Sequence, residues 1–436
     1  MKKKIFILIS IFLLIFSLTS CGKNEGSTTV NEVSSVTLKE QKACFNFFWE
    51  TQVIDVNKKG YGLIPDRYPS NGLASIASVG FGLAGFCVGV QNGWISKSEG
   101  EARAILTLRA MAELDTIHGF YYHFYYEESG KPASGSEISN IDTAILVAGA
   151  IMAGEYFQGK TKELATAIYD KVEWPWYINP ETNQFYMGYN PKTQKFEGAW
   201  DFYGEQLMMY FLAAGSSTFP IEKKVYDAFQ KYLGKYEAEN GEIYIFYNSW
   251  FGSIFTYQFS HAFVDFRNLM DPNGINWYDN SVTATLAHRQ YCIDNSDVYM
   301  AYGENSLGIT ACDTPNGYNG YLGAAPSGKD NLAHQNEGTM SLAGSGGSMP
   351  FAPKEVEASL AYYYRILQGK LVGKYGLYDS YNITNGDVWI APDVIGIDKG
   401  VVLLMIENYR SELVWKYFMQ ADFMDTAIEV LGFEEI

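Results

Sequence analysis

From Thr37 to the C-terminus, apolar residues recur at helical spacing in long blocks, and connections rich in Gly, Pro and Asn separate these blocks. This spacing gives each block an apolar face to bury, which restricts the chain to architectures built from packed helices. Strand-like stretches are short and cover residues 120–126, 184–189 and 242–247. The pattern predicts about twelve helices, over residues 38–53, 73–91, 97–116, 139–158, 162–172, 201–214, 220–236, 257–269, 279–293, 353–367, 397–408 and 410–430.

The order of these elements selects among the helical folds. There is no βαβ rhythm to indicate a parallel sheet, and no fixed-period repeat to indicate a solenoid. Helical hairpins can instead close into a ring whose inner helix ends and loops line a central crevice. We therefore expect an all-α (α/α)6 barrel with short β-hairpins, formed by residues 38–436 as a single domain. Residues 294–349 contain little helical pattern, and we expect them to cover one face as a lid or rim.

The N-terminus has the pattern of an export signal. Three lysines at positions 2–4 precede an apolar run at 5–16, which is too short to span a membrane, and Leu-Thr-Ser-Cys follows at 18–21. This ending resembles a bacterial lipobox and predicts a lipoprotein signal peptide at 1–21, with Cys21 as the lipidated residue. Residues 22–37 are polar enough for a flexible tether. We expect an extracytoplasmic protein anchored by lipid to the cell membrane or outer membrane; the alternative is secretion without a lipid.

Composition narrows the ligand class. The net charge of -17, with 49 acidic and 32 basic residues, would repel a polyphosphate backbone, which excludes a nucleic-acid partner. The 33 Tyr, 27 Phe and 9 Trp exceed what a core of this size ordinarily uses, and Tyr and Trp suit half-wet grooves. A neutral, hydroxyl-rich ligand fits this surplus better than an anionic one.

Motifs for other chemistries are missing or misplaced. The five histidines show no metal-binding spacing, and residues 294–297 lack the glycine and the final Glu of a calcium loop. The G-x-G-x-x-G match at 80–85 lies inside a helical block, where small residues serve close helix packing rather than dinucleotide binding. Residues 344–348 do not form a serine-hydrolase elbow, because Ala343 replaces its first glycine. We expect no metal and no cofactor.

Four cysteines follow Cys21, at positions 44, 87, 292 and 312. They form no Cys-x-x-Cys pair and are widely spaced, which is typical of buried apolar residues. A bridge between Cys292 and Cys312 is the alternative that the sequence leaves open.

The first candidate site lies in residues 196–210. An aromatic, turn-rich segment runs into a helical apolar pattern here and places Trp200, Tyr203 and Glu205 near the mouth of a helix. Flat rings suit the C–H faces of sugars and a carboxyl group suits proton transfer, so the segment offers both parts of a carbohydrate site. The alternative is a buried aromatic cluster beside a solvated Glu.

The second candidate site lies in residues 136–144. Ser139 or Asn140 can cap the helix that follows, which leaves Glu137 in the preceding loop and Asp142 in the first turn. The helix dipole favours an ionised carboxylate at this end, which suits a base or an electrostatic stabiliser. The alternative is that both acids are ordinary solvated charges.

Acidic, aromatic and arginine residues recur at other predicted helix ends, and we expect several to converge on one crevice. Neighbouring Arg and Asp residues can equally form structural ion pairs. Besides Trp200 and Tyr203, the substrate-binding candidates are Asp66, Arg67, Trp250, Tyr257, Gln258, Arg267, Glu337 and Trp389.

Six motifs stand in an order that resembles a known family. They are Phe47 to Glu50, Gly62 to Arg67, Ser136 to Ala144, Trp200-x-x-Tyr203-x-Glu205, Phe255 to Arg267, and Ile406 to Arg410. Together they resemble the bacterial glycoamylase-like proteins, in particular glycoside hydrolase family 144, the endo-β-1,2-glucanases. The resemblance covers nearly everything from residue 38 onward. It implies an (α/α)6 barrel that hydrolyses β-1,2-glucan with inversion and without a metal.

The resemblance also implies roles for three carboxyl groups. The acidic candidates of the family fall on Glu137 and Glu205, which implies that Glu205 is the general acid and that Glu137 or Asp142 activates water. An aspartate that the family carries a few residues before the first of these is absent, because Ser134 and Gly135 occupy that loop. Asp142 can support Glu137 or take over part of its role.

The expected substrate is an oligosaccharide or polysaccharide, acted on by a monomer. Four alternatives remain open within this interpretation. They are an exo-acting enzyme that releases sophorose, a glucoamylase-like α-glucan hydrolase, a transglycosylase, and a non-catalytic lipoprotein that binds glucan.

Overall fold

The computed structural model describes residues 30–328 and 331–436 of the 436-residue chain. The predicted signal peptide with Cys21, and residues 22–29 of the predicted tether, lie outside the described residues. Among the helices of the described ranges, none combines the length and the hydrophobicity that crossing a membrane requires.

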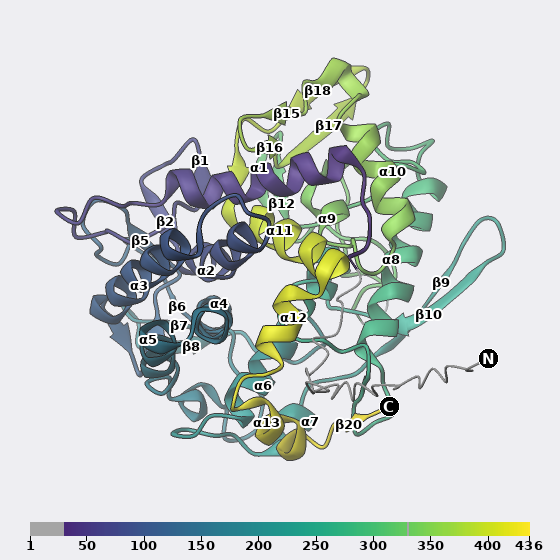
Figure 1. Cartoon of the computed structure of the whole chain (residues 1–436). Coiled ribbons are helices and arrows are strands. Elements are labelled where there is room, and N and C mark those ends of the chain that lie inside the picture. Colours follow the sequence, from purple (N-terminus) through teal and green to yellow (C-terminus); the bar gives the residue numbers. More distant parts are fainter. Residues whose placement is uncertain (1–29, 329–330) are drawn as a thin grey trace, which may run out of the picture.

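Helices dominate the described chain, and only short strands accompany them (Figure 1). The α-helices are α1 (Ser35–Thr51), α2 (Ile76–Gln91), α3 (Lys97–Glu113), α4 (Asn140–Phe157), α5 (Gly159–Tyr169), α6 (Leu207–Ala214), α7 (Lys223–Asp227), α8 (Trp277–Asp294), α9 (Ala343–Gly346), α10 (Pro353–Tyr363), α11 (Gly396–Ser411), α12 (Leu413–Phe418) and α13 (Met424–Leu431). The 3-10 turns are η1 (Trp174–Tyr177), η2 (Ile254–Tyr257), η3 (Ser260–Ala262) and η4 (Ile366–Gly369).

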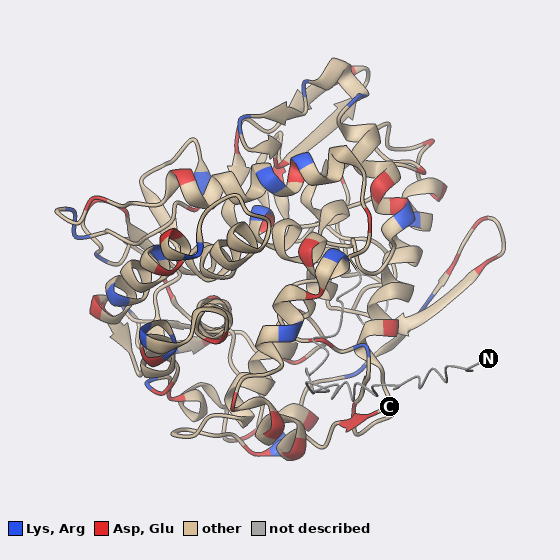
Figure 2. Ribbon diagram, viewed as in Figure 1, with Lys and Arg blue, Asp and Glu red and all other residues tan. Residues whose placement is uncertain are grey.

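The helices alternate between an outer and an inner ring. The inner layer consists of α2, α4, α6, the η2–η3 segment, α9 and α11, each nearly buried along its length. The outer layer consists of α1, α3, α5, α7, α8 and α10, and α1 packs against α11 to close the ring (Figure 1). Many of the charged residues lie on these outer helices and on surface loops (Figure 2). The predicted all-α (α/α)6 barrel is confirmed.

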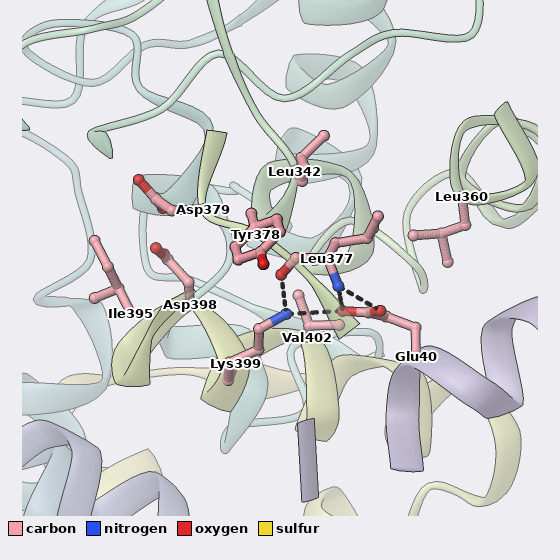
Figure 3. A pocket seen from close by; sticks show the side chains of 11 residues that line it. Glu40, Leu342, Leu360, Leu377, Tyr378, Asp379, Ile395, Asp398, Lys399 and Val402 are labelled. Carbon is pink, nitrogen blue, oxygen red and sulfur yellow. Dashed lines mark hydrogen bonds and ion pairs between the residues drawn. The ribbon is translucent and has the colours of Figure 1, made fainter. Parts of the chain in front are cut away.

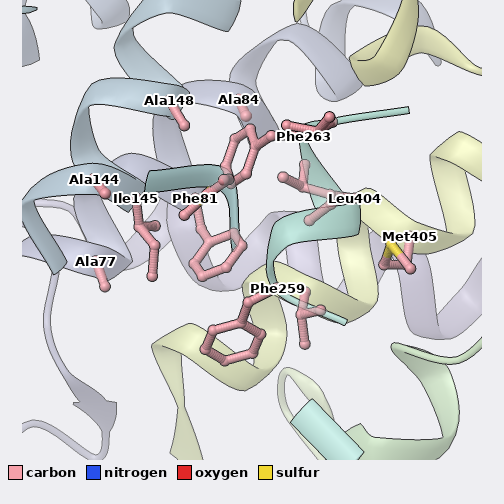
Figure 4. Close-up of a cluster of buried hydrophobic side chains, with 14 of the residues drawn as sticks. Ala77, Phe81, Ala84, Ala144, Ile145, Ala148, Phe259, Phe263, Leu404 and Met405 are labelled. Carbon is pink, nitrogen blue, oxygen red and sulfur yellow. The ribbon is translucent and has the colours of Figure 1, made fainter. Parts of the chain in front are cut away.

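The core forms where the inner helices meet. In α2 every residue from Ile76 to Gly89 is buried, and Phe81 of this helix packs between α4 and residues Phe259 and Phe263 (Figure 4). The helices α2 and α4 cross so closely at Gly80 and Gly149 that a Cβ on either would overlap the facing backbone. The prediction that the glycines of α2 serve helix packing is therefore confirmed.

Small antiparallel sheets lie at the ends of the helices. Three of them contain or adjoin residues of the candidate site. These are β1 (Arg67–Tyr68) with β19 (Val394–Ile395), β2 (Leu73–Ser75) with β5 (Phe124–Tyr126), and β6 (Ile138–Ser139) with β7 (Gly188–Asn190) and β8 (Lys195–Glu197). The other strands are β3 (Thr116–Ile117), β4 (Phe120–Tyr121), β9 (Leu233–Glu237), β10 (Ile243–Tyr247), β11 (Leu269–Met270), β12 (Cys312–Thr314), β13 (Gly317–Asn319), β14 (Thr339–Ser341), β15 (Val372–Gly373), β16 (Gly376–Leu377), β17 (Ser380–Thr384), β18 (Asp387–Ile390) and β20 (Glu434–Glu435).

The structure contradicts the predicted helix at 257–269. This segment forms the short turns η2 and η3 because its side chains bond to neighbouring elements rather than to its own backbone. The Ser260 hydroxyl accepts from Met208 N and donates to Glu205 O, and the Gln258 amide donates to Gly344 O. Phe259 and Phe263 face the core four residues apart, which imitates helical periodicity.

The predicted helix at 220–236 is also wrong beyond Asp227. Residues Leu233–Glu237 pair with Ile243–Tyr247 in a hairpin that extends away from the barrel (Figure 1). The β-branched and aromatic residues of β10 favour an extended strand. Residues 233–237 pair with this strand and are therefore extended as well. The predicted helix at 410–430 is divided into α12 and α13.

The four cysteines of the described chain are free and buried: Cys44, Cys87, Cys292 and Cys312. Their prediction as apolar core residues is confirmed, and the alternative of a bridge between Cys292 and Cys312 is wrong.

Candidate active site

An aromatic cavity of about 320 Å³ opens beside the start of α6. Trp200 forms part of its wall, and its indole Nε1 donates to Asn140 Oδ1 at 3.1 Å, which ties the wall to the first residue of α4. Trp250 is 49% exposed and packs edge-on against Phe202, so its ring remains available to a ligand. The cavity therefore offers flat apolar surfaces beside polar groups, as sugar recognition requires.

Glu205 lies in the wall of this cavity, in the turn that precedes α6. Ser260 holds the turn by donating to the Glu205 backbone oxygen at 2.7 Å. Burial, and further the negative charge of Asp142, raise the pKa of Glu205 to about 7. A large fraction of this carboxyl group therefore carries a proton at neutral pH, which is the state that a general acid needs.

Glu137 and Asp142 lie on either side of His123. The His123 Nδ1 is 2.8 Å from Glu137 Oε1, and its Nε2 is 3.7 Å from Asp142 Oδ1. Burial lowers the pKa of His123, but Asp142, Glu137 and Asp66 outweigh this effect and raise it to about 9. The imidazole is therefore a cation at neutral pH and holds the two carboxylates in fixed positions.

The two carboxyl groups beside His123 differ in their electrostatics. Burial opposes the ionisation of Glu137, but the hydrogen bond and positive charge of His123 prevail and lower its pKa. Burial raises the pKa of Asp142, and His123 and Ser139 offset only part of this rise. Glu137 is thus ionised at a pH where Glu205 is still largely protonated.

The N-terminus of α4 explains the position of Asp142. Ser139 caps the helix by accepting from Asp142 N at 3.2 Å, and its hydroxyl donates to Asp142 Oδ2 at 2.5 Å. The sequence predicts this cap, with Glu137 in the preceding loop and Asp142 in the first turn. Glu137 lies beside β7, because a Cβ on Gly188 would contact its Cγ at 3.6 Å, and the adjacent Met187 lines the cavity.

Three further acidic residues, Asp66, Asp313 and Asp393, form a row beyond His123. Asp66 acts electrostatically on both His123 and Asp142. The neighbouring Arg67 donates to Asp66, and its Nη1 also lies 2.9 Å from Asp313 Oδ2 and 2.8 Å from Asp393 Oδ2. Arg67 is thus an ion-pair centre that neutralises part of the row, with its Nε and Nη1 donating to carboxylates of the protein.

A buried group of charges lies at the N-terminal end of α11 (Figure 3). Lys399 donates to Glu40 Oε1 at 2.9 Å and to Leu377 O at 2.5 Å, which links α1 to α11. Beside this pair, burial and the charge of Asp398 raise the pKa of Asp379 well above its usual value, and burial raises the pKa of Asp398 to about 6.

The structure brings together part of the predicted site. Trp200, Tyr203, Glu205 and Trp250 line the cavity. Asp142, 63 positions earlier in the sequence, contributes to the raised pKa of Glu205. Asp66 and Arg67 lie in the acidic row beyond His123.

Three predicted substrate ligands have structural roles. Tyr257 is buried beneath the cavity, where its ring packs against Tyr203 and its hydroxyl accepts from Ser249 N. Gln258 is buried and bonds to Gly344 O and Ser348 Oγ. Arg267 pairs with Asp265 and with Glu412, and its guanidinium stacks on Trp415. These three side chains thus make contacts within the protein, and none of them lines the cavity at Glu205, so their role as substrate ligands stays a prediction.

Glu337 and Trp389 do not belong to the cavity at Glu205. They line a separate pocket beside the β17–β18 hairpin. This pair is therefore not among the several candidates that we expected to converge on one crevice.

Sequence reasoning misses three residues of the site. His123 carries no metal-binding spacing, and only the pairing of β2 with β5 reveals its position between two acids. Phe202 and Tyr321 also line the cavity. Tyr321 belongs to the predicted rim at 294–349, and its ring is 57% exposed.

Among the described residues, no group of three or more His, Cys, Asp or Glu side chains has an arrangement that could hold a metal ion.

Comparisons with known proteins agree with this geometry. A family model described as "Glycoamylase: Putative glucoamylase" matches residues 197–422, more than half of the chain. The chain is 26% identical over 419 residues to an exo-β-1,2-glucooligosaccharide sophorohydrolase (non-reducing end) of Parabacteroides distasonis. That match covers 87% of this chain and 55% of the relative, so the chain spans about half the length of this curated relative.

Two solved structures extend the comparison. An endo-β-1,2-glucanase of Chitinophaga pinensis, in complex with sophorotriose and glucose, has 26% identity and a TM-score of 0.80, with 93% of this chain and 99% of that chain covered. A Bacteroides uniformis protein that carries the same description as the family model has 26% identity and a TM-score of 0.81 with the same coverage. With a matching family model over more than half of its length, the chain belongs to the glycoamylase family of glucoamylase-like proteins.

Proposed function

We propose that the protein is a metal-independent glycoside hydrolase that cleaves β-1,2-glucan or its sophoro-oligosaccharides. The observation that carries the proposal is Glu205 in an aromatic cavity, with its pKa raised to about 7, together with Glu137, whose pKa His123 lowers against the effect of burial. The relatives named above support the linkage, since one is a β-1,2-glucanase and another a sophorohydrolase.

Glu205 and Glu137 divide the chemistry between them. Glu205 donates its proton to the glycosidic oxygen as the bond breaks, so the departing sugar leaves as a neutral alcohol and the negative charge stays on Glu205. Glu137 has 42% of its side chain exposed, so it is open to solvent, and it takes a proton from the water that attacks the anomeric carbon. Inversion follows when a water molecule enters between the two carboxyl groups, which requires a separation of about 6.5–9.5 Å.

His123 and Asp142 support this pair. The imidazolium lowers the pKa of Glu137 against the effect of burial, whereas burial, with a further contribution from the charge of Asp142, raises the pKa of Glu205. These surroundings favour opposite protonation states in two residues of the same type, which is how one site performs acid and base chemistry at one pH.

A second form of the same activity is exo action. The rim segment, residues 294–349, favours it. Tyr321 lines one side of the cavity, and its ring packs edge-on against Phe251. Ala324 N donates to Gly252 O, which fixes the rim against the loop that carries Trp250. A cavity bounded on this side would admit the end of a glucan more readily than its middle.

Product analysis tests the proposal. Wild-type protein is incubated with β-1,2-glucan, β-1,3-glucan and starch, and products are followed by chromatography. We expect products from β-1,2-glucan alone, of a single small size if action is exo and as a ladder if it is endo. Glu205→Gln should lower turnover by about 100- to 10,000-fold. Glu197→Gln, an exposed glutamate of β8 outside the cavity, is the matched control and should retain activity.

Two outcomes contradict the proposal. Cleavage of starch but not of β-1,2-glucan would assign another linkage. Binding of β-1,2-oligosaccharide without release of reducing ends, in the wild type as well as in Glu205→Gln, would identify a glucan-binding protein instead of an enzyme.

We also propose that the protein is extracytoplasmic and lipid-anchored at Cys21, on the basis of the lipobox pattern at 18–21. In cells that express the full chain, Cys21→Ser should move the protein from the detergent-soluble membrane fraction to the aqueous fraction. An unchanged distribution would contradict the anchor.

A further inference from the structure

A second pocket, of about 400 Å³, lies against the β17–β18 hairpin and shares no residue with the cavity at Glu205. It lies between this hairpin, Glu337 and the tip of the β12–β13 hairpin (Figure 1 locates these strands). The hairpin carries Trp389 on β18, opposite Asn382 on β17. We call this site the hairpin pocket.

Trp389 differs from the other tryptophans of the protein. Each of the other eight packs against an aromatic ring, forms a hydrogen bond, or does both. Within the described residues Trp389 has neither kind of partner, and it does not belong to the hydrophobic core, yet it is only partly exposed. An indole that the fold does not use, placed in the wall of a pocket, is a surface for a ligand.

The polar side chains around the indole suit a neutral, hydroxylated ligand. Asn316 and Asn385 present exposed amides, and Glu337 and Asp387 add carboxylates, while the lining contains no lysine, arginine or histidine. Anionic ligands would meet repulsion here. Amides and carboxylates beside a flat ring can instead pair with sugar hydroxyls and cover a sugar face.

The pocket is held in shape before any ligand arrives. Asn382 donates to Glu337 O at 3.1 Å and to Thr339 Oγ1 at 3.0 Å, which fixes the hairpin to the segment that carries Glu337. Asn385 and Gly386 both have positive φ and close the two-residue loop of the hairpin, an arrangement that Asn-Gly adopts readily. A preformed pocket loses little entropy when it binds.

The β12–β13 hairpin connects the two pockets. Its tip at Asn316 borders the hairpin pocket, and Tyr321, shortly after its second strand, lines the cavity at Glu205. A strand of three residues is about 10 Å long, so the two pockets lie within reach of one oligosaccharide. Tyr318 and Tyr321 along this path are 53% and 57% exposed.

From this arrangement we propose that the hairpin pocket is an accessory binding site for neutral oligosaccharide, with Trp389 as the stacking platform, which holds a distant part of a long glucan. The inference rests on the proposed function for the identity of the sugar. Binding at the hairpin pocket should lower the KM for long substrates and should not affect short ones, which end before they reach the pocket.

The test compares two lengths of substrate. We expect Trp389→Ala to raise the KM for polymeric β-1,2-glucan by about two- to tenfold, the worth of one aromatic stacking contact. The kcat and KM for sophorotriose should remain those of the wild type. Asn316→Ala should show a smaller change in the same direction, and Val298→Ala, an exposed apolar residue elsewhere, should show none.

A binding measurement separates this inference from the proposed function. In the Glu205→Gln background, calorimetry with β-1,2-glucan should show weaker binding when Trp389→Ala is added. If the wild type cleaves β-1,2-glucan and Trp389→Ala changes neither KM nor binding, the accessory site is refuted and the function stands. If no variant binds or cleaves β-1,2-glucan, the proposed function fails.

Discussion

The surroundings of Glu205 and Glu137 move the pKa values of these two carboxyl groups in opposite directions. Burial and the charge of Asp142 raise the pKa of Glu205, while the His123 cation lowers that of Glu137. Titratable groups separated in this way mark acid and base roles. His123 does not line the cavity, but it lowers the pKa of both acids beside it, Glu137 and Asp142.

His123→Asn tests this role. Removal of the cation should raise the pKa of Glu137 and of Asp142, because the cation lowers both. A base must be ionised to act, so the acidic limb of the kcat/KM profile should move to higher pH. The measurement is the pH dependence of hydrolysis of a soluble sophoro-oligosaccharide.

His118→Asn is the matched control for this experiment. The His118 Nδ1 lies 2.8 Å from Glu173 Oε2, the same distance as in the His123 and Glu137 pair, and His118 stacks on Trp176. Its positive φ of 51° is a conformation that Asn accepts. The control should keep the wild-type profile. An acidic limb that is the same in both variants would remove His123 from the mechanism.

At the scale of single residues, the sequence identifies candidate residues more readily than it identifies their hydrogen-bond and ion-pair partners. Glu205, Glu137 and Asp142 stand out because each accompanies an aromatic segment or a helix cap. The bond between His123 and Glu137 is invisible to such reasoning, since it depends on how β2 pairs with β5 and β6 with β7. Gln258 shows the converse, because nothing local indicates that Gly344 and Ser348 already accept from its amide, whereas the ion pair of Arg267 with Asp265 is visible in the sequence.

Short strands and a helix cap place the chemical groups of the site. The β1–β19, β2–β5 and β6–β7 pairs bring Arg67, His123 and Glu137 to the same end of the barrel, and the first turn of α4 adds Asp142. None of these strands exceeds three residues, so tertiary contacts rather than strand propensity hold them in place.

Ser139→Ala tests the cap of α4. The loss of an N-cap hydroxyl should destabilise the protein by about 0.5–2 kcal/mol. It should also raise the pKa of Asp142 further, because the Ser139 hydroxyl lowers that pKa through its hydrogen bond. We therefore expect kcat to fall while KM changes little, as measured by steady-state kinetics alongside urea unfolding.

Ser96→Ala provides a cap of the same kind away from the site. Ser96 and Glu99 form a capping box on the outer helix α3. This variant should lose similar stability and keep its kcat. Equal losses of kcat in both variants would show that the cap of α4 acts through stability alone.

The elements themselves were partly predictable. The long periodic blocks at 73–91, 139–158 and 279–293 correspond to α2, α4 and α8. The segment 257–269 misleads, because burial on all sides gives η2 and η3 the apolar spacing of a helix while Ser260 and Gln258 bond to other elements. The segment 220–236 misleads because its last residues take their conformation from β10, a partner later in the chain.

The ring closes through contacts between the two ends of the described chain. Glu40 and Gln41 of α1 bond to Lys399 and Glu407 of α11. The Lys399 and Glu40 side chains are 6% and 2% exposed, so each depends on the other for its charge. Removing one member of such a pair leaves an uncompensated buried charge.

Lys399→Met should therefore destabilise the whole barrel, by about 3–5 kcal/mol. The measurement is the urea midpoint of unfolding, followed by fluorescence and by far-UV circular dichroism. Coincident midpoints are expected, because residues 38–436 should unfold as one unit. Lys58→Met, which breaks the exposed ion pair with Glu128, is the control and should leave the midpoint nearly unchanged. Equal stability of the two variants would contradict the structural role of Lys399.

The overall architecture was the most predictable level. Apolar spacing and short connections suffice for a helical ring, since each hairpin must bury its apolar face against its neighbours. The pocket at Trp389 could not be predicted as separate, because its distance from Glu205 depends on the path of residues 294–349.

The most direct test of the account is the pH profile of kcat/KM for a sophoro-oligosaccharide, measured from pH 4 to 9. Because Glu205 must be protonated to act, activity should fall as the pH rises through the pKa of about 7, and the residual activity of Glu205→Gln should lack this alkaline limb. A wild-type profile that stays flat to pH 9, or an alkaline limb that persists in Glu205→Gln, would contradict the assignment of Glu205 as the general acid.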